Sequence, residues 1–171
     1  LQINYSFNMV CISDKKPMCL GLLEMLDSYI EHQRDVTTNR CNFELAKAER
    51  RLHIVEGLIS MVSILDAVIR TIRNSVNKKD AKENIITNYG FTERQAEAIV
   101  NLQLYRLTNT DIVELKAEAN DLTSLIKKLQ KILSSESALL NAIKNELLDT
   151  KTKIDTPRKT KIEHEIEEVS Y

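Results

Sequence analysis

The sequence contains very little proline, glycine or aromatic residue, and each shortage restricts the fold. Only 2 prolines and 3 glycines occur in 171 residues, and Pro17 and Pro157 both lie outside the region 18–156. Proline ends or kinks helices, and since neither proline lies in that region, no helix there is interrupted by proline. Tryptophan is absent, aromatic residues make up 5% of the chain and charged residues make up 29%. This composition favours an elongated helical protein over one with a thick spherical core.

Net charge, cysteine pairs and long apolar runs are also lacking. The net charge is -1, so the chain lacks the overall positive charge that is typical of nucleic-acid-binding proteins. The net charge does not describe local basic patches. The 3 cysteines, Cys11, Cys19 and Cys41, lack the close spacing of a zinc site, and we expect buried, reduced thiols. The sequence has no secretory leader and no apolar run of about eighteen residues, so we expect a cytoplasmic protein without membrane contact.

Motifs for catalysis, metal binding or cofactor binding are missing as well. His53 has no second histidine at metal-ligand spacing, and is expected to be a rim or hydrogen-bonding residue. The sequence has no Glu-x-x-His pair of a di-iron bundle, no Gly-rich phosphate loop and no nucleophile elbow. We therefore expect no catalytic, metal or cofactor site in these residues, which disfavours an enzymatic helical bundle.

Two long runs of apolar residues at heptad spacing are the main feature that is present. They predict two helices that pair with each other as an antiparallel coiled-coil arm, because the segment between them has helical patterns of its own. The expected fold is mainly α, with a small all-helical dimerisation head at the tip of the arm. The first run contains Cys41, Leu45, Ala48, Leu52, Val55, Ile59, Val62, Leu65, Val68 or Ile69, Ile72 and Val76. The second contains Ile112, Ala119, Ile126, Leu133, Leu140, Leu147 and Ile154, with Leu115, Leu122, Leu129 and Ile143 interleaved.

The first run has a defect near its end. Ile59, Val62 and Leu65 follow one another at two successive steps of three, and this stammer shifts the buried stripe around the helix. The favoured interpretation is that the helix leaves the coiled coil here to pack into the head. Gly57 lies two residues earlier, and the second interpretation makes it a functional flex point.

The amino-terminal residues alternate between apolar and polar and predict a β-strand over residues 1–11, closed by a turn at 13–17. We expect its sheet partners to lie outside this chain, as the remnant of an upstream domain, and the chain to be part of a longer protein. The predicted divisions are a strand and turn at 1–17, an outgoing helix at 18–76, the head at 77–110, a return helix at 111–155 and a tail at 156–171 that is basic and then acidic.

The head is predicted to contain two short helices. The first runs from Asp80 to Tyr89 and ends at Gly90, a residue suited to a left-handed cap. Thr92 and Gln95 form a capping box that opens the second, which is apolar on nearly all sides up to Leu107. We expect a second subunit to cover this helix, although helix ends of the same chain are an alternative. The predicted dimer-interface residues are Ala96, Ile99, Val100, Leu102, Leu104, Tyr105 and Leu107.

One basic cluster is predicted at the end of the arm remote from the head. Solvated charge is the ordinary explanation for such a cluster, and contact with a nucleic-acid backbone is the more specific one. The residues concerned are Lys15, Lys16, Arg34, Arg40, Arg158, Lys159 and Lys161.

Several ordered blocks of the sequence resemble the A subunit of bacterial type IIA DNA topoisomerases, in a form more similar to topoisomerase IV than to gyrase. The resemblance covers almost the whole chain. The blocks include Phe43-Glu44-Leu45-x-Lys47-Ala48-Glu49-x-Arg51, Phe91-Thr92-Glu93-x-Gln95-Ala96-x-Ala98-Ile99, Leu104-x-Arg106-Leu107-Thr108 and Arg158-x-Thr160-x-Ile162.

The resemblance implies a gating role within an ATP-dependent isomerase. In that family the two long helices form an arm, and the head pairs with its dimer mate as the exit gate, or C-gate, through which a transported duplex leaves. It implies a homodimer, a B subunit that uses Mg2+ and ATP, and double-stranded DNA as partners. The catalytic tyrosine belongs to an upstream domain, so these residues alone should be inactive. The alternative function is a coiled-coil scaffold or adaptor that dimerises through its head.

Overall fold

The computed structural model describes residues 6, 8–13, 15–102, 109–154, 156–157 and 159–160. In these residues a short hairpin of β1 (Val10–Ser13) and β2 (Lys16–Cys19) leads into α1 (Leu22–Val62). The elements α2 (Leu65–Asn74), α3 (Lys78–Tyr89) and α4 (Glu93–Asn101) follow, and then α5 (Asn109–Leu133) and α6 (Glu136–Lys153). The mainly α fold class is confirmed.

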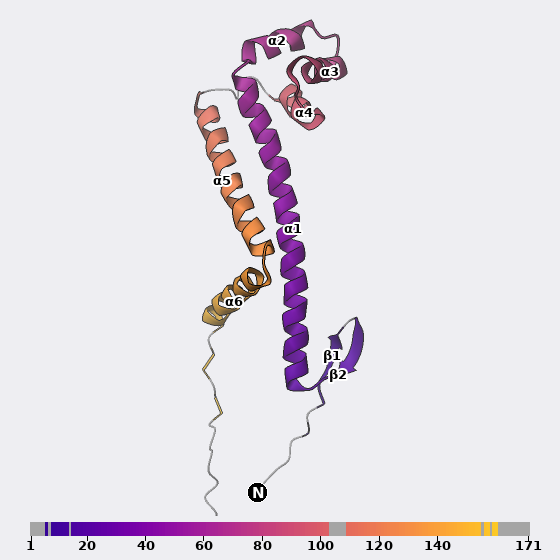
Figure 1. The fold of residues 1–171 in the computed structure, drawn as a ribbon, viewed down its shortest axis with the longest axis vertical. Coiled ribbons are helices and arrows are strands. Elements are labelled where there is room, and N and C mark those ends of the chain that lie inside the picture. Colours follow the sequence, from indigo (N-terminus) through magenta and orange to yellow (C-terminus); the bar gives the residue numbers. More distant parts are fainter. Residues whose placement is uncertain are drawn as a thin grey trace, which may run out of the picture.

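Helices α1 and α5 form the arm, and α2, α3 and α4 gather at its upper end (Figure 1). The chain ascends in α1 and descends in α5, as the predicted antiparallel pair requires. Cys41, Ala48 and Val55 of α1 are buried at 3%, 4% and 0% exposure, and Ile126 and Leu129 of α5 at 9% and 4%. These five residues belong to the predicted heptad positions, and they form the seam of the arm.

The outgoing helix differs from its prediction, because it does not continue to residue 76. It ends at Val62, and after Ser63 and Ile64 the chain resumes as α2, which is bent by 95° from α1. The amides of Ser63 and Ile64 donate to the carbonyls three residues earlier, over 3.3 and 3.0 Å, which tightens the last turn. The stammer therefore marks the point where the helix turns into the head, as the favoured interpretation stated.

The return helix also differs from its prediction. It is broken into α5 and α6 at Ser134 and Ser135, although the apolar heptads continue through the break. The Ser135 hydroxyl accepts a hydrogen bond from the Ala138 amide at 3.2 Å, and so caps the start of α6. The prediction of one helix over 111–155 was wrong because two consecutive serines favour a cap over helix continuation.

The amino-terminal strand has a partner within this chain. β1 pairs with β2 in antiparallel register, from Val10 opposite Cys19 to Ser13 opposite Lys16. Lys15, in the connecting turn, has a φ of 62°. The expectation that all strand partners lie elsewhere was therefore wrong for β1, while residues 1–5 and 7 of the predicted strand lie outside the described residues.

Candidate functional site

The head is built around a compact apolar cluster from four helices. The end of α1 supplies Leu58 and Met61, α2 supplies Val68 and α3 supplies Ile85. Two of the helix boundaries in the head are as the sequence predicts: Gly90 ends α3 with a φ of 71°, and Thr92 opens α4 with a capping box. Helix α3 begins at Lys78 rather than at the predicted Asp80, and Asn77 caps it. Because each of these helices ends after a few turns, the chain can fold back, and α2, α3 and α4 pack against the tip of the arm. The buried members are Leu58, Met61, Val68, Ile85, Phe91, Ala96 and Ile99.

This cluster corrects part of the predicted dimer interface. Ala96 and Ile99 are 0% and 3% exposed within the single chain, so neither side chain presents surface to a second subunit. For these two residues the alternative is correct: helix ends of the same chain cover them. Val100 and Leu102 are half-buried against the cluster, and Leu104, Tyr105 and Leu107 lie outside the described residues.

Helix α4 also ends earlier than predicted. Its last helical residue is Asn101, and Leu102 follows with an extended ψ of 129°. The Leu102 amide still donates to the Ile99 carbonyl at 3.1 Å. The predicted helix is therefore interrupted at Leu102, and residues 103–107 of its predicted course lie outside the described residues.

A polar clasp joins α4 to α1; it consists of His53, Gly57, Thr92 and Gln95. The Gln95 amide nitrogen donates to the His53 carbonyl at 2.8 Å, and the Gln95 amide oxygen accepts from the Thr92 backbone amide at 3.1 Å. The Thr92 hydroxyl lies 2.7 Å from His53 Nε2. His53 is thus a hydrogen-bonding residue, as expected, and the capping box of α4 is attached directly to the arm.

Gly57 permits this clasp, and the structure does not support its interpretation as a flex point. It is buried inside the continuous helix α1, and a Cβ placed on it would lie 2.6 Å from Gln95 Cγ. Only a residue without a side chain lets Gln95 approach α1 this closely. The combination of a helical glycine and a distant capping-box glutamine is the part of the site that sequence reasoning missed.

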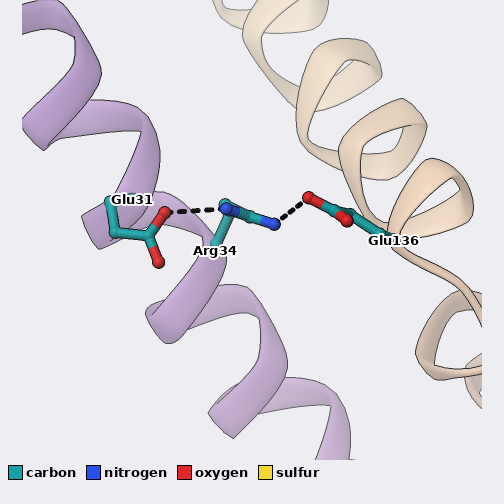
Figure 2. A network of polar contacts seen from close by, with 3 residues as sticks. All are labelled: Glu31, Arg34 and Glu136. Atoms are coloured by element: carbon teal, nitrogen blue, oxygen red, sulfur yellow. Dashed lines mark hydrogen bonds and ion pairs between the residues drawn. The ribbon is translucent and has the colours of Figure 1, made fainter.

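Two of the three arginines of the predicted basic cluster, Arg34 and Arg40, are engaged in ion pairs. Arg34 Nη1 lies 2.8 Å from Glu31 Oε2, and its other terminal nitrogen contacts Glu136 of α6 (Figure 2). Arg40 pairs with Glu146. Hydrogen bonding to these carboxylates raises the pKa of both guanidinium groups, and both charges are compensated within the chain. Contact of Arg34 and Arg40 with DNA stays a prediction, and such a contact would compete with these exposed ion pairs.

The remaining members of the cluster give less information. Lys15, Lys16 and Lys159 are exposed, whereas Arg158 and Lys161 lie outside the described residues. No ion pair of the described part of the chain includes Lys15 or Lys16, which both lie on the hairpin. DNA contact by these lysines stays a prediction.

The ion pairs also show how α6 lies on the arm. A third pair joins Arg51 to Glu118, with Nε to Oε1 at 2.6 Å. From Arg51 to Arg34 the chain moves 17 residues, and from Glu118 to Glu136 it moves 18, as antiparallel helices require. Arg40 breaks this register because its partner is Glu146. Helix α6 therefore lies obliquely to α1, and among the described residues no return helix lies beside the lowest part of α1 (Figure 1).

Among the described residues, no group of three or more His, Cys, Asp or Glu side chains could hold a metal ion. The three cysteines are free thiols; Cys41 is buried, Cys11 is partly buried and Cys19 is exposed, which corrects the expected burial of Cys19. Burial raises the pKa of the Cys41 thiol. The contacts described at this site are those of packing and hydrogen bonding between α4 and α1.

None of the described helices alone combines the length and the apolar character needed to cross a bilayer, and α1 with α2 meets both criteria only as a pair across the 95° bend.

Comparison with known proteins agrees with this architecture. The family model for the A subunit of DNA gyrase/topoisomerase IV matches residues 1–148. The A subunit of DNA topoisomerase 4 from Staphylococcus aureus (strain NCTC 8325 / PS 47) is 59% identical over 169 residues, which cover 99% of this chain and 21% of the relative. A second S. aureus form of that protein is 58% identical over the same extent. The chain thus spans about a fifth of these relatives' length, and it belongs to the family of DNA gyrase and topoisomerase IV A subunits.

Proposed function

We propose that this chain forms the coiled-coil arm and exit gate of a type II DNA topoisomerase A subunit, most similar to the topoisomerase IV form. The gate would hold two A subunits together while a duplex is cut, and open to release a second duplex. The partners are a second A subunit, a B subunit that uses Mg2+ and ATP, and double-stranded DNA in the cytoplasm. The 171 residues alone are expected to cut no DNA.

The observation that carries this proposal is a compact head clasped to the tip of a long arm. Helix α1 has 41 residues and is therefore about 60 Å long. Each degree of rotation at its base moves the tip by about 1 Å over that length. Because the head is packed onto α1 by a buried core and by the Gln95 clasp, it follows the arm as one body. Small movements at the base are thus enlarged at the head.

The contact between the two heads is proposed for the surface that begins at Val100 and Leu102. The predicted interface residues Leu104, Tyr105 and Leu107 directly follow it in the chain. Covering each large apolar side chain contributes on the order of 1.5–3 kcal/mol, so a few of them hold a dimer that still opens. Asp substitution of Val100 and Leu104 should yield monomers in sedimentation equilibrium. Ile99→Asp is unsuitable for this test because it would disrupt the core of the head.

Reversible locking of the heads tests the gate. In a full-length A subunit with its B subunit, Cys11, Cys19 and Cys41 are replaced by Ser or Ala, and a single cysteine is placed at Val100, Asn101 or Leu102. A cysteine near the two-fold axis forms a disulfide with its own symmetry mate when the Cα atoms lie within about 7 Å. The matched control carries the cysteine at Thr87, an exposed residue of α3.

Oxidation should leave the formation of cleavage complexes intact and abolish repeated strand passage, with recovery on reduction. The scaffold alternative expects no such reversible loss. Undiminished decatenation by quantitatively crosslinked enzyme would refute the gate proposal. A contact elsewhere in the head would instead be indicated if none of the three positions crosslinked while the enzyme stayed dimeric.

A further inference from the structure

Four basic residues lie within ten positions of the chain around the junction of α2 and α3, at the outer end of the head, and we call this group the basic corner. Its residues are Arg70 and Arg73 of α2 and Lys78 and Lys79 of α3, and all four are exposed. In the part of the chain that the structure describes, no ion pair includes any of them. The corner is at the opposite end of the molecule from the β1–β2 hairpin (Figure 1).

The two lysines are placed against the electrostatic preference of their helix. Lys78 and Lys79 are the first two residues of α3, where the helix dipole favours negative side chains. The start of α3 is already stabilised without them, since Asn77 Oδ1 accepts from the Asp80 amide at 2.9 Å and Asp80 Oδ2 accepts from the Val76 amide at 2.9 Å. Helix formation therefore does not explain why two cations stand at this position.

The corner is continuous with the surface proposed to meet the second subunit. A hollow of about 300 Å³ beside it is lined by Lys78, Lys79, Lys82, Glu97 and Val100. Lys82 is held by Glu93 at 2.7 Å, so its charge is compensated, whereas the charges of Lys78 and Lys79 are not compensated by an ion pair in the described residues. Val100 belongs to the proposed head-to-head contact. A polyanion that leaves between the two heads would pass close to the corner.

We infer that the basic corner contacts the phosphate backbone of the duplex as it leaves the gate. This inference rests on the proposed gate function and adds a DNA-contacting surface to it. Lys side chains act on phosphates as mobile point charges, and Arg side chains as forked donors, and neither contact depends on base sequence. The duplex released by a gate has arbitrary sequence, so a contact of this kind suits it. The contrast with the base of the arm is direct, because Arg34 and Arg40 are ion-paired there.

The chemistry also predicts a contact that is weak and readily broken. Each neutralised phosphate of B-form DNA contributes about 0.9 to the slope of log affinity against log salt. If all four cations contact phosphates, raising salt fourfold should reduce occupancy of the corner on the order of 100-fold.

Photo-crosslinking can detect this contact in the working enzyme. Val76 is 90% exposed between the two helices, so a photoreactive benzoylphenylalanine can replace it without disturbing the core. In a full-length A subunit with its B subunit, irradiation during ATP-driven strand passage should crosslink position 76 to DNA. The yield is normalised to the cleavage complexes in the same sample, and it should fall steeply with salt. The photoreactive residue at the exposed Asn88 of α3 is the positional control.

A charge-neutral variant provides the second arm of the test. Gln substitution of Arg70, Arg73, Lys78 and Lys79 should reduce the crosslink at the lower salt by on the order of 100-fold, should remove most of its salt dependence, and should slow strand passage while cleavage continues. The matched control removes four exposed lysines of the arm, Lys127, Lys128, Lys131 and Lys144, and should leave the crosslink unchanged. Both variants lose the same charge, so only the position of the charge differs.

The outcomes separate this inference from the gate proposal. A fully active enzyme with no crosslink from position 76 to DNA would overturn the inference, and so would a crosslink only to the second A subunit. Equal loss of the crosslink in both charge variants would overturn it as well, because the effect would then come from net charge. If disulfide locking of the heads blocks turnover but the crosslink is absent, the gate stands and the basic corner does not.

Discussion

The head and the base of the arm differ in how completely the chain covers its own apolar residues. In the head, Met61 and Ile85 are 1% and 0% exposed, and the cluster around them is closed by helices of this chain. At the base, Leu22 and Leu23 of α1 are 62% and 75% exposed, and Ile12 of the hairpin is 80% exposed. An apolar surface of this extent ordinarily marks a contact region. The described helices of the head thus enclose their own apolar cluster, whereas the base presents exposed apolar side chains to other structure.

The two ends also use polar contacts differently. In the head, Gln95 and His53 form short hydrogen bonds across two helices at a close approach that only Gly57 allows. At the base, long arginine side chains bridge α1 and α6 through exposed ion pairs, which contribute little and are screened by salt. A movement of the arm is thus expected to be resisted at the head and tolerated at the base.

The largest expected effect contrasts the two cores directly. Ile85→Ala removes a fully buried side chain from the head cluster and should lower the free energy of unfolding by about 2–5 kcal/mol. Leu23→Ala removes a side chain that is 75% exposed and should change that free energy by less than about 0.5 kcal/mol. Urea unfolding followed by helicity measures both. Equal losses would show that the base is as well packed as the head.

The next prediction concerns the clasp, where the sign of the effect is decisive. Gly→Ala in a helix ordinarily stabilises by about 1 kcal/mol. Gly57→Ala should instead destabilise by about 1–3 kcal/mol, because the added Cβ would lie 2.6 Å from Gln95 Cγ. In a double-mutant cycle, Gln95→Ala should remove most of that cost. Stabilisation by Gly57→Ala alone would show that the clasp does not constrain the head.

Sequence patterns predicted the elements of the head well because its stops are local. Gly90 adopts the left-handed conformation expected of it, and Thr92 with Gln95 forms the expected capping box. Sequence patterns failed where the assignment of a buried residue depends on tertiary contacts. Ala96 and Ile99 were assigned to a second subunit, because periodicity shows that a side chain is buried but not which chain buries it.

In the arm, the sequence patterns identified the buried face of the helices but missed the break in the return helix. Its heptads predicted the seam at Ala48, Val55 and Ile126, yet the same apolar period continues through Ser134 and Ser135, where the helix breaks. Apolar spacing reports the face of a helix and is insensitive to an interruption that preserves the spacing. Likewise, Arg34 and Arg40 look like free cations in sequence, since their carboxylate partners Glu136 and Glu146 are distant in the chain.

A third prediction concerns the break between α5 and α6, because removing it should make the base resemble the upper arm. Changing Ser134 and Ser135 to Ala removes the cap of α6, which is worth about 0.5–2 kcal/mol, and leaves Leu133, Leu140 and Leu147 in one uninterrupted heptad. The two helices should then join. Spin labels at the exposed Ser124 and Asn145 should move apart to a backbone separation of about 32 Å, that of a straight helix. Thr150→Ala is the control, and an unchanged distance would place the cause of the break in tertiary contacts.

The smallest expected effect concerns the ion pair between Arg51 and Glu118 in the upper arm. The hydrogen bond from Arg51 lowers the pKa of Glu118 below its ordinary value. A carboxylate whose pKa is lowered by folding stabilises the folded state above its ordinary pKa, and this stabilisation is lost as pH falls through the lowered value. Both side chains are more than a third exposed, so solvent screening limits the contribution of this ion pair to the free energy of unfolding to about 0.2–1 kcal/mol. Arg51→Gln should therefore unfold slightly more readily at pH 7, and should lose less stability than the unmodified chain between about pH 5 and pH 3. Parallel pH profiles for the two proteins would mean that the upper arm, like the base, gains nothing from its exposed charges and is held by its apolar seam alone.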